Sequence, residues 1–325
     1  MREVVEGHLA RVRAADPLVT VAPLDGDLIE VPDAVGAPSV AVTRADAVRW
    51  GPVVTHALQA RVAGDDPAGA LGRLLDRWIS GLDLRAPDPD HRTSNPDLRP
   101  SGLGAGVDAG LVVNWPSRDT APVAALVRRG FAPRTILAVR VAPASPAGQP
   151  PRGTPAVPPS PGVRRAVADD LDAMCRLYLE LIDYEAQFGW VPPALPSTAA
   201  AARAELAEKL TRGDGWCWLA ERDGDVTGML AIHHPSRAGR IASAVRASPV
   251  AYVGSLYARA GSRGRGTGAA LADHAHAVVA AAGVETVLVH YMAANPLSVP
   301  FWSRQGYRPL VTTWGRLAAT SDHRP

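Results

Sequence analysis

A strand, a glycine-rich turn and a helix follow one another directly between Leu256 and Ala282. The turn is Arg263-Gly-Arg-Gly-Thr-Gly268, and the residues after it have helical apolar spacing. The first N–H groups of a helix lack intrahelical partners and point along its dipole, so such a turn binds anions. Its three glycines let a pyrophosphate approach the main chain, and Arg263 and Arg265 add cationic donors. A lone Gly-x-Gly is also typical of a flexible loop, but the strand before and the helix after favour a phosphate site.

A proline-rich segment divides the chain, whose 325 residues are enough for two domains. Eight of the twenty residues from 143 to 162 are proline, which fits neither a helix interior nor a central strand. We therefore expect a first domain over residues 1–142, a linker over 143–162 and a second domain over 163–325.

The second domain predicts a mixed α/β order of elements. Period-2 and apolar runs predict strands at Val163–Val167, Trp216–Arg222, Val226–His233, Ala251–Ala258 and Thr286–Tyr291, and a last strand pair around Tyr307–Leu317. Helical spacing predicts helices at about Leu171–Phe188, Thr198–Thr211, Gly268–Ala282 and Pro296–Gln305. Asp223-Gly224-Asp225 is typical of a hairpin turn, and Ala168-Asp169-Asp170 of a helix start.

The sequence at the end of the first domain is similar to that at the end of the second domain, which lies 176 residues later. Residues 119–133 and 295–309 share Val, Arg, Gly and Pro at equivalent places, and Phe131 matches Tyr307. An apolar strand precedes and follows each copy. The repeat favours a duplicated domain over chance similarity between two helices rich in Arg and Ala.

The block from Leu256 to Tyr307 resembles the GNAT superfamily of acyl-CoA-dependent N-acyltransferases. The first part of the family signature is Gln or Arg, then x-x-Gly-x, then Gly or Ala. The second part, downstream, is Asn-x-x-Ala-x-x, then Phe or Leu, then Tyr-x-x-x-Gly-Phe. Arg263–Gly268 matches the first part, and Asn295 through Phe301, Trp302 and Gly306-Tyr307 matches the second. The resemblance covers Val163–Leu317 and reaches the first domain only through the repeat. It implies two GNAT-like α/β domains, each a twisted mixed β-sheet flanked by helices, the first one degenerate.

The resemblance also implies a site for acetyl-CoA or another acyl-CoA as co-substrate, with direct attack of an amine on the thioester. Loop amides would hold the pyrophosphate at Arg263, Gly264, Arg265, Gly266, Thr267 and Gly268. Main-chain groups of Leu256, Tyr257 and Ala258 would bond the pantetheine arm and the thioester carbonyl, where the fourth and fifth strands splay apart. Asn295 would form a hydrogen bond with the pantetheine as well. Ser298 stands where the family has Ala, and we include it among the expected cofactor-binding residues.

Trp302 departs from the family pattern. The family has a tyrosine there that is thought to protonate the leaving thiolate, whereas an indole N–H donates a hydrogen bond but does not usefully deliver a proton. Water or another group could act instead, or protonation of the thiolate is not needed. We expect Trp302 at the thioester.

No motif identifies the general base. The candidates are His233 with its neighbour His234 at a strand end, Glu185 or Tyr184 after the first helix, and Tyr252 in the fourth strand. The ordinary pKa of histidine, about 6.5, suits proton abstraction near neutrality, but a His pair is also typical of a solvated strand end. The aromatic residues of 184–190 either line the acceptor pocket or pack under a loop.

Composition excludes several classes of protein. The 34 Lys and Arg residues against 32 Asp and Glu leave a net charge of +2, too little to coat nucleic acid. Two cysteines, Cys175 and Cys217, allow neither a disulfide scaffold nor a multi-cysteine zinc site, and we expect no metal. The sequence shows no membrane-spanning run and no signal peptide, which predicts a soluble, cytoplasmic protein. A single lysine among many Ala, Arg, Pro and Gly residues suggests a bacterial source.

The first domain contains a second glycine pattern, Arg99-Pro-Ser-Gly102-Leu-Gly104. The next strand starts by about Gly110, so no helix fits between, and we reject this pattern as a CoA site. The first domain would then serve structure or close the acceptor cleft.

We therefore expect an N-acetyltransferase that acylates a primary amine of a small molecule, as a monomer or homodimer without nucleic-acid or membrane partners. A non-catalytic acyl-CoA-binding pseudoenzyme is one alternative, favoured by Trp302 and the missing base. Acylation of a peptide or protein N-terminus is another, and it predicts an open groove rather than a pocket. The identity of the amine and the acyl length stay open.

Overall fold

The computed structural model describes residues 1–31, 39–47, 54–82, 109–142, 162–191, 193–194, 196–211 and 216–317. They belong to two compact units, which we describe separately. Unit 1 comprises Met1–Ile136, Gly189–Pro192 and Pro309–Pro325, and unit 2 comprises Leu137–Phe188 and Pro193–Arg308. The proline-rich linker up to residue 161 and the pattern Arg99–Gly104 lie outside the described residues.

Unit 1 is a mixed sheet with the strand order β1-β2-β3-β4-β11-β5. β1, β2 and β3 pair antiparallel, β3 and β4 pair parallel, and β4 pairs antiparallel with β11. Its core joins Leu74, Leu75 and Trp78 to apolar strand residues such as Leu111. The helices are α1 (Arg2–Ala15), α2 (Pro67–Gly81) and α3 (Val123–Val127); the strands are β1 (Asp27–Val31), β2 (Ser39–Ala47), β3 (Val54–Arg61), β4 (Ala109–Pro116), β5 (Ala132–Val141) and β11 (Arg308–Leu317).

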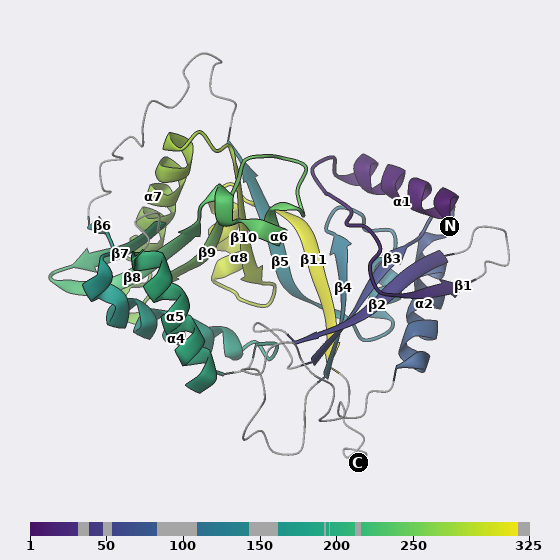
Figure 1. The fold of residues 1–325 in the computed structure, drawn as a ribbon, viewed down its shortest axis with the longest axis horizontal. Coiled ribbons are helices and arrows are strands. Elements are labelled where there is room, and N and C mark those ends of the chain that lie inside the picture. Colours follow the sequence, from purple (N-terminus) through teal and green to yellow (C-terminus); the bar gives the residue numbers. More distant parts are fainter. Residues whose placement is uncertain are drawn as a thin grey trace. The chain divides into compact units, whose positions relative to one another are not determined.

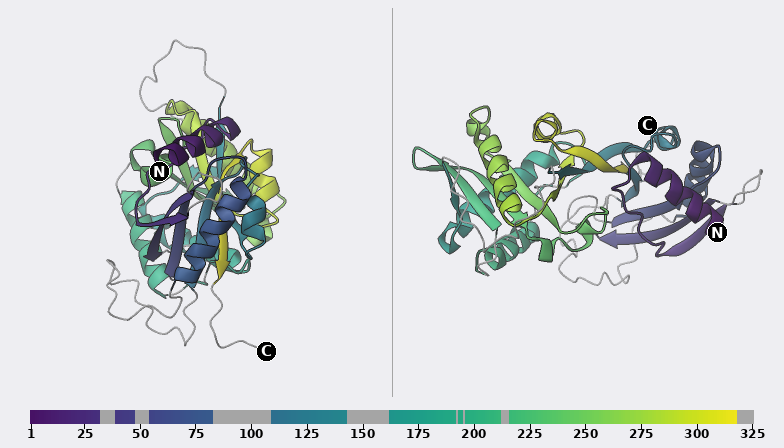
Figure 2. Two further views of the ribbon diagram at one scale, coloured as in Figure 1. Left: turned by 90° about the vertical axis from the view of Figure 1, so that its right-hand side faces the viewer. Right: turned by 90° about the horizontal axis from the view of Figure 1, so that it is seen from above.

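Unit 2 continues from Leu137 within β5 and has the strand order β5-β10-β9-β8-β7-β6. Helix α7 packs on one face of β8 and β9, and α4 packs on the other with α5 beside it (Figures 1 and 2). The strands are β6 (Val163–Arg165), β7 (Trp216–Arg222), β8 (Asp225–His233), β9 (Val250–Ala258) and β10 (Thr286–Met292). The helices are α4 (Leu171–Ala186), α5 (Pro196–Thr211), α6 (Gly239–Ala242), α7 (Thr267–Ala281) and α8 (Ser298–Arg304), with 3₁₀ turns η2 (Ala168–Asp170), η3 (Pro235–Arg237) and η4 (Ala260–Ser262).

The expected mixed α/β sheet flanked by helices is confirmed, and most local elements lie where the sequence predicts them. β7 has the predicted bounds, and Asp223 and Gly224 form the predicted turn with φ angles of 53° and 85°. The short helices η3 and α6 between β8 and β9 were not predicted, because a run of three or four residues has no periodicity to detect.

The predicted strand pair around Tyr307–Leu317 is wrong: β11 is one strand. Leu310, Thr312 and Trp314 alternate inward, with no turn between them. From Pro309 on, β11 belongs to unit 1, where Thr312 pairs with Trp115 of β4 and Trp314 joins the core. The sequence-based division assigns residues 309–317 to the second domain, whereas the structure assigns them to unit 1. Conversely, the part of β5 from Leu137 on belongs to unit 2, although the sequence-based division places it in the first domain.

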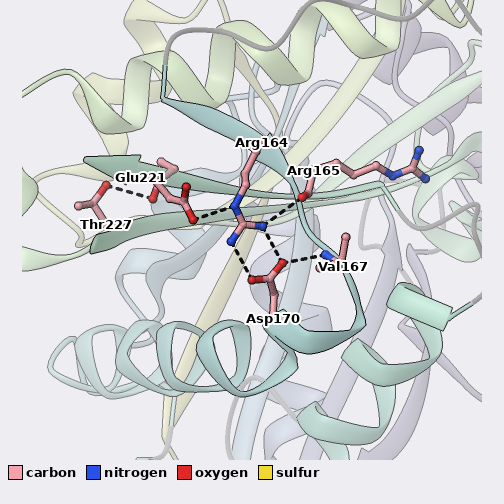
Figure 3. A network of polar contacts seen from close by, with 7 residues as sticks. Arg164, Arg165, Val167, Asp170, Glu221 and Thr227 are labelled. Carbon is pink, nitrogen blue, oxygen red and sulfur yellow. Dashed lines mark hydrogen bonds and ion pairs between the residues drawn. The ribbon is translucent and has the colours of Figure 1, made fainter. Parts of the chain in front are cut away.

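An ion-pair network joins β6, β7 and the turn before α4 (Figure 3). The guanidinium of Arg164 in β6 donates to both oxygens of Asp170, at 2.7 and 2.8 Å, and to Glu221 of β7 at 2.7 Å. Asp170 also accepts from the backbone N–H of Val167 at 2.8 Å, which caps the turn that leads into α4. The hydrogen bond from Arg164 lowers the pKa of Asp170 below its ordinary value. One carboxylate thus joins the strand to the helix start.

Candidate functional site

A cavity of about 400 Å³ lies in unit 2, where the glycine loop, the end of β9, α4 and α8 meet. It is bounded by side chains from all four segments. Its wall includes Leu181, Tyr184, Glu185, Leu256, Tyr257, Ala258, Ser262, Arg263, Gly264, Gly266, Thr267, Gly268, Ala269, Asn295, Leu297, Ser298, Phe301, Trp302, Arg304 and Gln305. Residues more than 100 positions apart in sequence therefore surround one space.

The glycine loop opens the helix α7 toward this cavity. Gly264 and Gly266 have φ angles of 73° and 86°, in the left-handed region that only glycine adopts readily. The first α-helical bond here runs from the N–H of Ala270 to the carbonyl of Gly266 at 2.9 Å. The N–H groups of the preceding turn therefore have no carbonyl one helical turn back, which makes this helix start able to bind an anion.

Arg263 ties the loop to α4 and β9. Its guanidinium carbon lies 4.3 Å from the ring centre of Tyr184 and 5.7 Å from that of Tyr257. Its Nε donates to the carbonyl of Ala258 at 3.3 Å. Of the expected loop residues, Arg265 alone does not line the cavity. Its carbonyl accepts a hydrogen bond from the guanidinium of Arg222 at 2.9 Å. These contacts hold the loop in place before any ligand binds.

The end of β9 has one edge without a partner strand. Within the described residues, β10 pairs with β9 only from Val250 to Val253, whereas β8 pairs with it as far as Ala258. The main chain of Leu256 on the β10 side thus has no strand partner at the cavity wall, and the Ala258 carbonyl nearby accepts from Arg263. This is the separation of strands that the sequence resemblance implies.

Asn295 and Glu185 form a buried pair in the wall. Asn295 is 1% exposed; its Oδ1 accepts from the N–H groups of Leu297 and Ser298 at 2.9 and 3.1 Å, and so caps the start of α8. Its Nδ2 donates to Oε1 of Glu185 at 2.9 Å. Oε2 of Glu185 is buried and has no hydrogen-bond partner among the described residues. Burial raises the pKa of Glu185, against the opposing effect of the Asn295 hydrogen bond.

Trp302 lines the same cavity and is 6% exposed. Its ring packs edge-on against Phe301 and Tyr307, with ring centres 5.0 Å away in both cases. The Tyr307 hydroxyl lies 3.1 Å from Nε2 of His276 and so has a partner of its own. Trp302 is therefore held by aromatic packing.

His233 and Tyr252 lie on the sheet beyond the cavity wall. They are paired across β8 and β9, with ring centres 5.4 Å apart, and the Tyr252 hydroxyl is 3.2 Å from Nδ1 of His290. Nε2 of His233 is 3.2 Å from Nζ of Lys209. Burial and then the charge of Lys209 lower the pKa of His233 to about 4, so the ring is a weaker base than its ordinary pKa suggests. Burial raises the pKa of Tyr252.

The structure thus gathers most of the expected cofactor residues, together with Glu185 and Trp302, around one cavity, and leaves out Arg265, His233 and Tyr252. The wall residues that sequence reasoning missed are Leu181, Ser262, Ala269, Leu297, Phe301, Arg304 and Gln305. Leu181 could have been found, because it precedes Tyr184 and Glu185 by three and four positions and shares their helix face. No group of His, Cys, Asp or Glu able to hold a metal occurs in the described ranges. No described helix is long and apolar enough for a membrane span.

The order of elements and the loop at the start of α7 define this unit as a GNAT-type acyltransferase fold. Residues 176–307 match the model of the acetyltransferase (GNAT) family, so the chain carries a GNAT acetyltransferase domain. A domain of this family implies acyl transfer from acyl-CoA, and the family uses acetyl-CoA. A comparison with curated proteins finds no match.

One solved structure with a TM-score above 0.5 agrees with this fold. A GCN5-related N-acetyltransferase from Sphaerobacter thermophilus is 16% identical, with a TM-score of 0.51, over 91% of this chain and 82% of that one. A GNAT-family acetyltransferase from Colwellia psychrerythraea is 10% identical, with a TM-score of 0.47, over 98% of this chain and 97% of that one. The first similarity shows the fold alone, because the identity is low.

Proposed function

We propose that this protein is an N-acyltransferase that transfers an acetyl or other acyl group from acyl-CoA to a primary amine of a small molecule. The observation that carries the proposal is the cavity between the glycine loop and the unpaired edge of β9. It joins an anion-binding helix start to main-chain groups that can bond an extended amide-containing arm.

The residues present fit acyl-CoA. At Gly264 and Gly266, a Cβ atom would meet no described atom within 4 Å, so open space lies beside the loop for a pyrophosphate. Loop N–H groups and Arg263 would hold this group. Leu256, Tyr257 and Ala258 would align the arm and polarise the thioester carbonyl, so catalysis rests mainly on orientation and charge stabilisation.

Of the two acceptor classes we propose the small molecule, and a peptide N-terminus, for which an open groove is expected, is the alternative. We infer neither a nucleic-acid nor a membrane partner, and expect a cytoplasmic bacterial enzyme that acts as a monomer or homodimer. Each unit contains three antiparallel strands, a helix, a strand parallel to the third one and a second helix, in this order. This order, with the repeat of residues 119–133 in 295–309, supports a duplicated GNAT domain.

A non-catalytic acyl-CoA-binding protein is the second candidate. Trp302 favours it, because an indole held between two rings at the cavity supplies no proton. The buried carboxyl of Glu185 in the same cavity favours the enzyme over this second candidate.

Two measurements test the proposal. Calorimetry with acetyl-CoA should detect binding, and CoA release should be measured with tyramine, spermidine and a tetrapeptide with a free N-terminus. Turnover with tyramine or spermidine supports the small-molecule enzyme. Turnover with the peptide alone supports the other acceptor class, binding without turnover supports the pseudoenzyme, and absence of binding overturns all three.

A further inference from the structure

Glu185 is a buried carboxyl in the wall of the cavity. We propose that its carboxylate binds the amino group of the acceptor and takes the proton that this group loses on acylation. The inference rests on the proposed function, and it names the group that sequence reasoning left undecided among Glu185, His233 and Tyr252.

The position of Glu185 is fixed from two sides. It lies in the last turn of α4, one position after Tyr184 and four after Leu181, and all three residues line the cavity. Asn295 reaches it from the start of α8, 110 residues away in sequence. Because Oδ1 of Asn295 accepts two backbone N–H groups, its Nδ2 must face Glu185, and the pair has one orientation. The carboxyl is therefore held in place without any ligand.

Among the described residues, Glu185 has fewer hydrogen-bond donors around it than a buried carboxylate normally has. Its side chain is 9% exposed, and a carboxylate has about four lone-pair sites, of which Asn295 fills one. No described Arg, Lys or His pairs with it. A buried charge is costly unless it is paired, so the pocket favours a ligand that brings a cation or N–H donors. A primary amine brings both.

The other titratable groups around the cavity are engaged elsewhere or differ in kind. Arg263 stacks on Tyr184 and bonds the carbonyl of Ala258, and Arg304 lies on the exposed side of α8. Tyr184 and Tyr257 are phenols that contact Arg263. Burial raises the pKa of Glu185 above its ordinary value, although the Asn295 hydrogen bond opposes this. His233 and Tyr252 stand outside the cavity wall.

The step balances with these groups. The bound ammonium first loses one proton to solvent, which leaves a neutral amine with a lone pair beside the carboxylate. This lone pair forms the new N–C bond, and the electron pair of the C–S bond leaves with sulfur. The proton released by nitrogen moves to the carboxylate of Glu185, and the thiolate regains a proton from this carboxyl. Glu185 thereby ends in its starting state, and Trp302 does not need to act as an acid.

Glu185→Gln is the decisive variant, because an amide still accepts from Asn295 and preserves the packing but cannot take the proton. Asp183→Asn is the matched control: it makes the same change two residues earlier on α4, at an exposed carboxylate. With the amine that wild type acetylates, we expect Glu185→Gln to lower kcat by roughly 10²–10⁴-fold, with unchanged acetyl-CoA affinity. The acid limb of the kcat/KM profile should disappear. Asp183→Asn should behave as wild type.

Two readouts do not need turnover. Infrared difference titration of wild type against Glu185→Gln should show one carboxyl with a pKa above its ordinary value of about 4.3. n-Butylamine, an ammonium ion at neutral pH, should bind wild type more tightly as the pH rises through this titration, since the ionised carboxylate pairs with it. Its affinity should fall at least ~10-fold in Glu185→Gln.

These outcomes separate the two proposals. Wild type that does not bind acetyl-CoA overturns the proposed function. In that case the n-butylamine affinity and the infrared titration still test whether Glu185 binds an ammonium group. Wild type that acetylates an amine while Glu185→Gln keeps full kcat and the same pH profile overturns the role of Glu185 alone. Equal n-butylamine affinity in both proteins overturns the ammonium site.

Discussion

Gly266→Val separates the binding role of the glycine loop from its contribution to folding. Gly266 has a φ of 86°, and a Cβ atom there would meet no described atom within 4 Å. The Cβ atom of the variant therefore has room, and the main cost to the fold is the left-handed backbone, roughly 1–2 kcal/mol. The same side chain would occupy the space through which a pyrophosphate reaches the loop N–H groups. We expect a folded protein whose acetyl-CoA affinity falls at least ~10-fold, which corresponds to about 1.4 kcal/mol.

Gly224→Val is the matched control. Gly224 has a φ of 85° and equally open surroundings, but it lies in the β7–β8 turn and not at the cavity. Both variants should lose similar stability, with melting temperatures lowered by roughly 2–4 °C per kcal/mol for a unit of this size. Calorimetry with acetyl-CoA and thermal unfolding are measured on the same samples. Unchanged affinity in folded Gly266→Val, or an equal loss of affinity in Gly224→Val, refutes the reasoning.

Three further variants test packing, burial and capping. Trp302→Phe should keep kcat within ~10-fold at saturating acetyl-CoA, because the ring only packs; a loss of ~10² or more with normal binding would assign the indole N–H a direct role. His274 is 3% exposed, and both ring nitrogens lack partners among the described residues. Burial lowers its pKa, so the unfolded chain takes up a proton first as the pH falls and stability drops. His274→Leu should raise the free energy of unfolding and flatten its decline from pH 7 to 5 in urea titrations; an unchanged slope contradicts this. Asp170→Ala should lower the same free energy by about 1–2 kcal/mol through loss of the cap and the Arg164 pair, whereas exposed Asp169→Ala should not.

Much of unit 2 could be predicted from local patterns because its signals are local. A hairpin turn needs two residues with positive φ, and Asp223-Gly224 supplies them. The helix start at η2 needs a side-chain acceptor, and Asp170 provides it within three residues. The glycine loop is similar, since its anion-binding groups come from consecutive N–H groups of one turn. Each of these features depends on a few neighbouring residues.

The choice among the candidate bases could not be made in this way. Glu185 differs from other carboxylates of α4 only through burial and through Asn295, which lies 110 residues away. His233 attracts attention by its ordinary pKa, but burial and Lys209 lower that pKa to about 4. Desolvation and charge proximity are properties of the packed structure, so a sequence does not display them.

Local patterns are enough to predict most elements of unit 2, the anion-binding loop and the family signature, because these rest on backbone preferences and contacts within a few residues. Which sheet β11 joins and which residues share the cavity depend on how distant parts of the chain pack. β11 has an apolar alternation that suits any sheet edge, yet it pairs with β4 and places Trp314 in the core of unit 1. A strand carries the pattern of its two faces, but its hydrogen-bond partner is set by which edge lies beside it once distant parts of the chain have packed.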